Sequence, residues 1–344
     1  MKTTYLKTVI LFTLFISLIS CDTNDNNDPN TPCDARFFNF VTDGDGSTNG
    51  TFNLFDYQKS TGFNMPNQLL GSNQNFLLPN LGIRYAKSAI EPNSGIIEYK
   101  IADIAISYDI NNNSVTQTPL TGALMLAENP EFLNGNLYFL KPDNIMPTSI
   151  QIVDENGVSI SPSLNINMTN SGLLNANTFS STSNLSDKIY YLENTNLITY
   201  DANSNTLSSV SIDTFNMTTN RVFYFGLEYV NNNTLYALQG NATSGQTIKL
   251  VKIDISNPSS PQISTLLDLT NSSALSFNPY SIVNGNAYVE SDYDSCDNSY
   301  YIAYTIPAGT NAQAYLVELK LNSNAINEYP SVPSVYYFGL DHLQ

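Results

Sequence analysis

A short segment of aromatic and aliphatic residues recurs six times along the chain, and this repeat constrains the fold more than any other feature. Apolar side chains alternate or cluster over five or six positions in each copy, a pattern typical of β-strands. Polar turns rich in Asn, Ser and Gly separate the copies, and helical periodicity is nearly absent after residue 30. We therefore predict an all-β chain. The six copies are residues 36–41, 95–100, 136–140, 188–192, 234–238 and 300–304.

A second predicted strand follows each copy, and in five copies it ends in an aspartate before a polar turn. Repeats separated by 45 to 53 residues, as these are, predict β-propeller blades. An aspartate in front of a turn accepts backbone N–H groups, so we interpret the five as structural residues and not as metal ligands. The five are Asp56, Asp109, Asp154, Asp201 and Asp254, and the sixth copy (LVELKL) has none.

The C-terminus carries the clue to how the repeat closes. The sequence FYFGLEY (223–229) precedes the fifth copy, and the similar YYFGLDH (336–342) ends the chain with no strand after it. The first copy lacks a preceding strand. We predict that the C-terminal strand pairs with the N-terminal repeat as its innermost strand, which closes the ring and hides the edge strands. This predicts a single propeller over residues 34–344 with six blades, or seven if residues 255–300 hide a degenerate blade.

The segment 225–238 (FGLEYVNNNTLYAL) resembles the blades of six-bladed propellers of the NHL/lactonase-like type. Residues 253–261 (IDISNPSSP) resemble a blade turn of bacterial surface propellers. The resemblance spans residues 34–344 and implies a fold, because its motifs are architectural and say little about function.

The N-terminal residues 1–20 predict a signal peptide. Lys2 and Lys7 flank the start of an apolar run, residues 8–19, which is too short to remain as a membrane span. Residues 18–21 (LISC) resemble the lipobox of bacterial lipoproteins. That resemblance implies cleavage before Cys21 and attachment of palmitate-type acyl chains to it, and several such chains anchor a protein stably.

Residues 21–33 predict a disordered tether, because the segment 22–32 (DTNDNNDPNTP) has no apolar residue to bury. Acidic residues directly after a lipidated cysteine resemble the surface-export signal of Bacteroidota lipoproteins. The implied location is the outer membrane, at the cell surface, with the periplasmic side as the alternative. In enterobacteria, an aspartate at that position would instead indicate retention in the inner membrane.

After cleavage, 11 basic residues face 30 acidic ones, a net charge of −19. This charge disfavours nucleic acid and anionic lipid surfaces as partners. We expect a monomer that meets the membrane through its lipid anchor and binds an envelope protein or a glycan.

Cys33 and Cys296 remain once Cys21 is acylated. In an exported protein two such residues predict a disulfide bond. Cys33 precedes the first aromatic strand and Cys296 precedes the sixth, so ring closure would bring them together and the bond would tie the last blade to the first.

Glu91, Glu228 and Asp341 occupy comparable places between the innermost strand and the next, with Glu290 or Asp292 as the sixth blade's counterpart. In calcium-dependent lactonase-like propellers, such carboxylates hold Ca²⁺ in the channel, where the ion could polarise an ester carbonyl. The resemblance thus implies a possible Ca²⁺ site, whereas the alternative is a set of turn-forming residues. We interpret the acidic segments 42–47 and 290–297 as hairpin turns.

Catalytic groups are sparse. The only histidine, His342, is interpreted as a surface residue near the C-terminus, and tryptophan is absent. We predict no catalytic residue and no cofactor apart from possible Ca²⁺. The expected function is that of a membrane-anchored, non-enzymatic binding lipoprotein of the cell envelope. The alternative is a calcium-dependent lactonase-like hydrolase.

Overall fold

The described residues form six antiparallel sheets of four strands each. The structure is a computed structural model that describes residues 36–43, 52–59, 67–68, 86–101, 104–122, 124, 127–143, 148–166, 179–193, 195–214, 221–241, 243, 247–276, 288–306, 313–329 and 335–343. The first three sheets, in chain order, contain β24 (Val335–Leu343), β1 (Arg36–Asp43), β2 (Phe52–Gln58) and β3 (Asn67–Gln68); β4 (Ala86–Glu91), β5 (Ile96–Ile101), β6 (Ile104–Asp109) and β7 (Ser114–Pro119); and β8 (Glu128–Leu133), β9 (Asn136–Pro142), β10 (Ser149–Asp154) and β11 (Leu164–Asn165). The other three contain β12 (Phe179–Ser183), β13 (Lys188–Glu193), β14 (Asn196–Asp201) and β15 (Thr206–Ser211); β16 (Val222–Asn231), β17 (Thr234–Asn241), β18 (Thr247–Asp254) and β19 (Gln262–Asp268); and β20 (Tyr288–Asp294), β21 (Ser299–Ile306), β22 (Gln313–Lys320) and β23 (Ala325–Tyr329).

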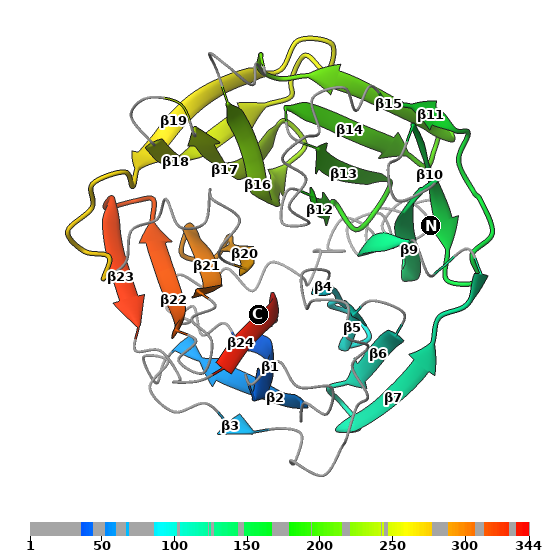
Figure 1. Ribbon diagram of the computed structural model, residues 1–344, viewed down its shortest axis with the longest axis horizontal. Coiled ribbons are helices and arrows are strands. Elements are labelled where there is room, and N and C mark those ends of the chain that lie inside the picture. Colours follow the sequence, from blue (N-terminus) through cyan, green and yellow to red (C-terminus); the bar gives the residue numbers. More distant parts are fainter. Residues whose placement is uncertain are drawn as a thin grey trace, which may run out of the picture. The chain divides into compact units, whose positions relative to one another are not determined.

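The sheets are arranged around a central axis. The first strands contact one another in cyclic order, from β24 through β4, β8, β12, β16 and β20 back to β24. Figure 1 shows β4, β12, β20 and β24 near the centre and β7, β15, β19 and β23 at the periphery. The predicted all-β propeller is therefore confirmed. All six aromatic segments are second strands of the sheets, and the described part of the segment 255–300 belongs to the last two sheets.

The two ends of the described chain close the ring. β24 pairs with β1 in an antiparallel register that places Phe37 opposite His342 and Phe38 opposite Asp341. The C-terminal strand is thus the innermost strand of the N-terminal sheet, as predicted. This pairing covers the inner edge of β1, which would otherwise be exposed.

The aspartates before the turns act as structural residues, as predicted. The backbone N–H groups of Asn112, Asn156, Ser204 and Ser256 donate to Asp109, Asp154, Asp201 and Asp254 over 2.9–3.1 Å. Asp56 is the exception and corrects the prediction. It lies inside β2, is buried, and pairs with Arg36 Nε at 2.5 Å.

Tyrosine hydroxyl groups bind asparagines in two turns, one of which follows Asp109. Tyr108 donates to Asn113 Oδ1 at 2.8 Å, and Tyr293 donates to Asn298 Oδ1 at 2.9 Å. Both asparagines have positive φ, near +50°, a conformation that asparagine tolerates better than most residues.

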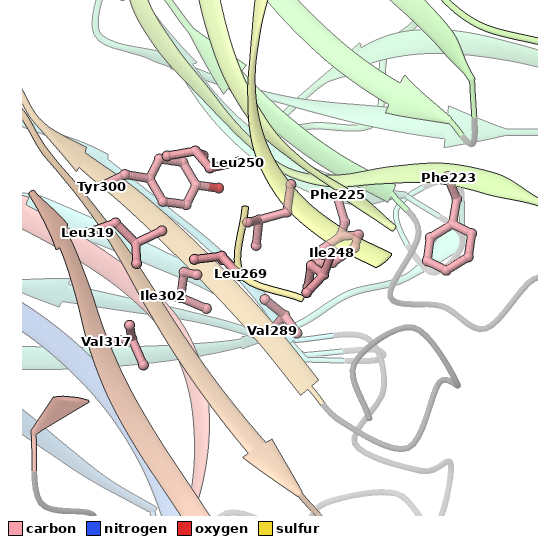
Figure 2. Packing of buried hydrophobic residues seen from close by; sticks show 11 residues of the cluster. Phe223, Phe225, Ile248, Leu250, Leu269, Val289, Tyr300, Ile302, Val317 and Leu319 are labelled. Carbon is pink, nitrogen blue, oxygen red and sulfur yellow. The ribbon is translucent and has the colours of Figure 1, made fainter. Parts of the chain in front are cut away.

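The hydrophobic core lies between neighbouring sheets. One cluster joins the sheet β16–β19 to the sheet β20–β23, and Figure 2 shows Leu250 beside Tyr300 within it. Each fully buried aliphatic or aromatic side chain contributes about 2 kcal/mol of transfer free energy. The cluster consists of Phe223, Phe225, Leu238, Ile248, Leu250, Leu269, Val289, Tyr300, Ile302, Val317 and Leu319.

Chain contacts divide the protein into the units Met1–Cys33 and Asp34–Gln344, and the sheets belong to the second unit. The predicted signal peptide, tether, Cys21 and Cys33 lie outside the described residues. In the part of the chain that the structure describes, no helix is long and apolar enough to cross a membrane.

Candidate functional site

A cavity of about 500 Å³ lies between the first strands of the six sheets, and every one of these strands contributes to its wall. Its size suits a small molecule. The turn residues Pro92, Leu185 and Ser295 complete the lining, so the cavity opens toward the hairpins that follow the first strands. The strand residues are 88–90 of β4, 131 of β8, 180–183 of β12, 226–230 of β16, 289–293 of β20 and 340–342 of β24.

Six lining residues, which we call the cavity ring, come one from each first strand. Each pairs with an aromatic residue in the second strand of its sheet. Four of the six are acidic and the other two carry hydroxyl groups. The pairs are Ser88 with Tyr99, Glu131 with Tyr138, Thr182 with Tyr190, Glu228 with Tyr236, Asp292 with Tyr301 and Asp341 with Phe38.

Irregularities in strand pairing precede three of the four acidic residues. The register of β16 shifts around Gly226, two residues before Glu228, and that of β8 shifts around Asn129, two residues before Glu131. Both shifted residues have positive φ, +62° and +51°. In β24 the shift falls at Gly339, two residues before Asp341. A β-bulge redirects the side chains that follow it, which brings these carboxyl groups to the same cavity.

Neighbouring sheets hold the bulge of β16 in place. The hydroxyl groups of Ser180 and Thr182 in β12 accept the backbone N–H groups of Leu227 and Tyr229 at 3.1 and 3.0 Å. On the other side, the Tyr300 hydroxyl donates to the Gly226 carbonyl. The irregular backbone is therefore satisfied by hydrogen bonds, and the cavity wall is fixed on both sides.

The acidic residues raise one another's pKa. For Glu131 and Asp341, burial is the largest cause and nearby carboxylates add to it, which raises the pKa of each to about 8. Burial and the charge of Asp292 raise the pKa of Glu228 well above its ordinary value, although the Ser291 hydroxyl donates to Glu228 Oε1 at 2.5 Å. Repulsion and desolvation both disfavour the ionised forms. Such clusters are concentrated at functional sites.

Asp341 combines burial with an unsatisfied oxygen. The residue is 8% exposed, and its Oδ2 atom has no hydrogen-bond partner among the described residues. A buried polar atom without a partner costs free energy, and a charged one costs more.

His342 also lines the cavity, so its interpretation as a surface residue was wrong. Its Nδ1 lies 2.8 Å from Asp292 Oδ2, and its ring centroid lies 5.5 Å from that of Phe37. Burial alone would lower the pKa of His342, but the neighbouring carboxylates, foremost Asp292, raise it. The predicted pairing of β24 with β1 places His342 on the innermost strand of the N-terminal sheet, beside the cavity.

The three predicted metal ligands do not come together as a group. Glu228 and Asp341 line the cavity, whereas Glu91 lies at the end of β4 and accepts hydrogen bonds from Ser94 N and from Asn93 Nδ2. Burial raises the pKa of Glu91, but these hydrogen bonds outweigh burial, so the pKa lies below its ordinary value. Within the described ranges, no group of three His, Cys, Asp or Glu side chains is arranged to hold a metal ion.

The sequence contained a signal for the missed residue Glu131. Asn-Pro-Glu (129–131) matches Gly-Leu-Glu (226–228) and Gly-Leu-Asp (339–341) in placing an acid two residues after one that accepts positive φ or a bulge. Because residue 129 is asparagine and not glycine, the similarity of these three segments is difficult to recognise in the sequence.

The acidic hairpin 290–297 is only partly a solvated turn. Asp294 is fully buried and pairs with Lys59 Nζ at 3.2 Å, and Lys59 also contacts Asp297. Cys296 lies in the turn between β20 and β21. Most of the other acidic segment, residues 42–47, lies outside the described residues.

Comparison with solved structures shows the same fold. A protein of unknown function from Bacteroides caccae superposes with a TM-score of 0.50 at 12% identity, covering 89% of this chain and 99% of that chain. A candidate TolB from Agrobacterium tumefaciens also gives 0.50, at 5% identity, with 90% and 99% covered. No protein-family model matches the chain. No curated protein sequence matches it either. At these identities the likeness concerns the fold alone.

Proposed function

We propose that this protein is a lipid-anchored lipoprotein of the bacterial outer membrane that binds a small ligand in its central cavity without changing it chemically. The observation that carries the proposal is the unsatisfied Oδ2 atom of the buried Asp341, set in a cavity to which all six first strands contribute. The expected envelope protein or glycan partner would have to present a group small enough to enter.

A ligand that donates a hydrogen bond to Asp341 Oδ2 would remove the free-energy cost of leaving this buried atom without a partner. Such a ligand stabilises the folded state in proportion to its concentration and affinity. Hydrogen bonds fix the cavity wall before a ligand arrives, which lowers the entropy lost on binding.

The described contacts of His342 include no serine or threonine hydroxyl group. Covalent catalysis by a serine or threonine needs a base that contacts the hydroxyl group. His342 contacts the Asp292 carboxylate and the Phe37 ring. The calcium-dependent hydrolase was predicted to bind Ca²⁺ through Glu91, Glu228 and Asp341. Glu91 does not line the cavity, so we do not propose that alternative.

The anchor part of the proposal rests on Cys21 and the sequence around it. Cells that express the full chain are labelled with radioactive palmitate, and the Cys21→Ser variant serves as the comparison. We expect label in the wild type and none in the variant. Label retained by Cys21→Ser, or its absence from the wild type, would refute lipidation at this residue.

The binding part is tested by thermal unfolding of the full chain with the small-molecule fraction of its own cell envelope. We expect a rise in Tm for the wild type and none for Val230→Trp, because Val230 lines the cavity and a larger side chain there would occupy it. Val158→Trp is the matched control, since Val158 is exposed and remote from the cavity lining. No rise in the wild type, or an equal rise in Val230→Trp, would count against the cavity as the binding site.

A further inference from the structure

The charged groups around the cavity are almost all acidic. Glu131 comes from β8, Glu228 from β16, Glu290 and Asp292 from β20, and Asp341 and His342 from β24, while β4 and β12 contribute hydroxyl groups. His342 is the one basic residue among the described lining residues, and Asp292 already binds it. Among the described residues, no salt bridge joins Glu131, Glu228 or Asp341 to a cation, although the charge of His342 also acts on Asp341.

Asp341 supplies the second, independent observation. Its Oδ2 atom is buried and receives no hydrogen bond from the described residues, although its side chain interacts with the Ser88 hydroxyl. Once the carboxyl group is ionised, this atom can accept an N–H or O–H group of a ligand.

Three ligand classes can be compared on these facts. An anion would be repelled by the carboxylates. A metal ion needs several ligands in fixed geometry, which the described acidic residues do not offer. An ammonium group donates three hydrogen bonds with loose directional demands, and its charge offsets the burial of a carboxylate.

We propose that the ligand of the cavity is a small organic amine whose ammonium group binds Asp341 Oδ2, with Glu131 and Glu228 as the neighbouring acceptors. This inference rests on the proposed function and names its ligand class. Binding ionises a protonated carboxyl group of the cavity, and the proton leaves to solvent. The ammonium keeps its own protons, so one proton is released for each carboxyl group that is ionised.

Isothermal titration calorimetry of the full chain in detergent tests this with 1,4-diaminobutane as the probe and 1,4-butanediol as its neutral counterpart. We expect the diamine to bind and the diol not to bind. With a carboxyl pKa near 8, affinity should increase about twentyfold from about pH 6.5 to about pH 8.5. Titrations in two buffers of different ionisation enthalpy should show proton release at the lower pH.

Two variants separate the cavity from the rest of the protein. Asp341→Asn keeps the shape and removes the charge, so the diamine should bind at least about tenfold more weakly and lose most of its pH dependence. Glu193→Gln is the matched control, because Glu193 is buried with a pKa raised by burial to about 7 and does not line the cavity. It should bind the diamine as the wild type does.

Equal binding of the diol, diamine affinity that does not change with pH, or stoichiometric Ca²⁺ binding lost in Asp341→Asn would overturn the ammonium assignment. If the diamine fails to bind while the envelope fraction still stabilises the wild type and not Val230→Trp, the ligand class is wrong and the proposed function stands. If both experiments fail, the proposed function falls with it.

Discussion

His342 Nδ1 lies 2.8 Å from Asp292 Oδ2, and this contact joins the last strand of the chain to the first strand of the sixth sheet. β24 belongs to the N-terminal sheet, so the contact crosses the junction where the ring closes. The ring of Phe37 packs against His342 and, with its centroid 4.4 Å away, against Tyr301 of the sixth sheet. Side chains as well as the backbone pairing of β24 with β1 therefore hold the closure together.

Asp292→Asn should lower the pKa of His342, because it removes the carboxylate that most favours the charged imidazole. A raised histidine pKa contributes stability that is complete below the unfolded-state value and is lost as the pH rises through the folded value. The chain has one histidine, so its NMR titration reads this pKa directly. Asp254→Asn, in a turn on β18, is the control and should leave the titration unchanged. An unchanged titration in Asp292→Asn would show that the pair does not form.

The architecture could be predicted well from the sequence because it depends on patterns within short segments. Alternating aromatic strands, turn residues and the likeness between residues 223–229 and 336–342 are each visible in short windows, and the structure has the corresponding strands. Asp56 fits less well, since Arg36 pairs with it inside the sheet. That contact depends on the register of β1 with β2, which a single strand does not reveal.

The site was harder to predict because β-bulges shift the positions of residues in some first strands relative to the corresponding strands of other sheets. Counting along the chain placed Glu91 with Glu228, but Ser88 is the residue of β4 in the cavity ring and Glu91 caps a turn. Each bulge adds a residue to one strand only, so equal sequence offsets do not lead to equal depths in the cavity. The raised pKa of Glu131 likewise depends on side chains from other sheets.

Asp341→Asn should make the protein more stable at alkaline pH. The folded state keeps a proton on Asp341 up to about pH 8, whereas the unfolded chain releases it near its ordinary pKa. The stability of the wild type should therefore fall as the pH rises between those values and level off above them. The asparagine cannot ionise, so denaturation at about pH 5, 7 and 9 should show a smaller decline than in the wild type. Parallel pH profiles for the two proteins would contradict the raised pKa.

Gly226→Ala should destabilise the fold by about 3 kcal/mol, because it adds strain at positive φ and a steric clash. A Cβ atom there would lie 2.5 Å from the Tyr300 hydroxyl and 3.1 Å from Ser291 Oγ. Gly135→Ala is the matched control, with φ of +72° and open space around the added atom, and should lose only about 1 kcal/mol. Urea denaturation measures both. Equal losses of stability in the two variants would mean that Tyr300 and Ser291 move aside to accommodate the added methyl group.

Cys33 and Cys296 should form a disulfide bond, and the described neighbourhood of Cys296 supports that prediction. Arg36, three residues after Cys33, pairs with Gln58 in β2, and the next residue, Lys59, binds Asp294 and Asp297 on either side of Cys296. The start of β1 therefore lies close to the turn that holds Cys296. A bond there would close a loop of more than 250 residues, which in the chain-entropy model stabilises a protein by up to about 5 kcal/mol. Peptide mass spectrometry without reduction should recover the linked pair, and reduction should lower the Tm. Recovery of both residues as alkylated thiols from the unreduced protein would rule the bond out.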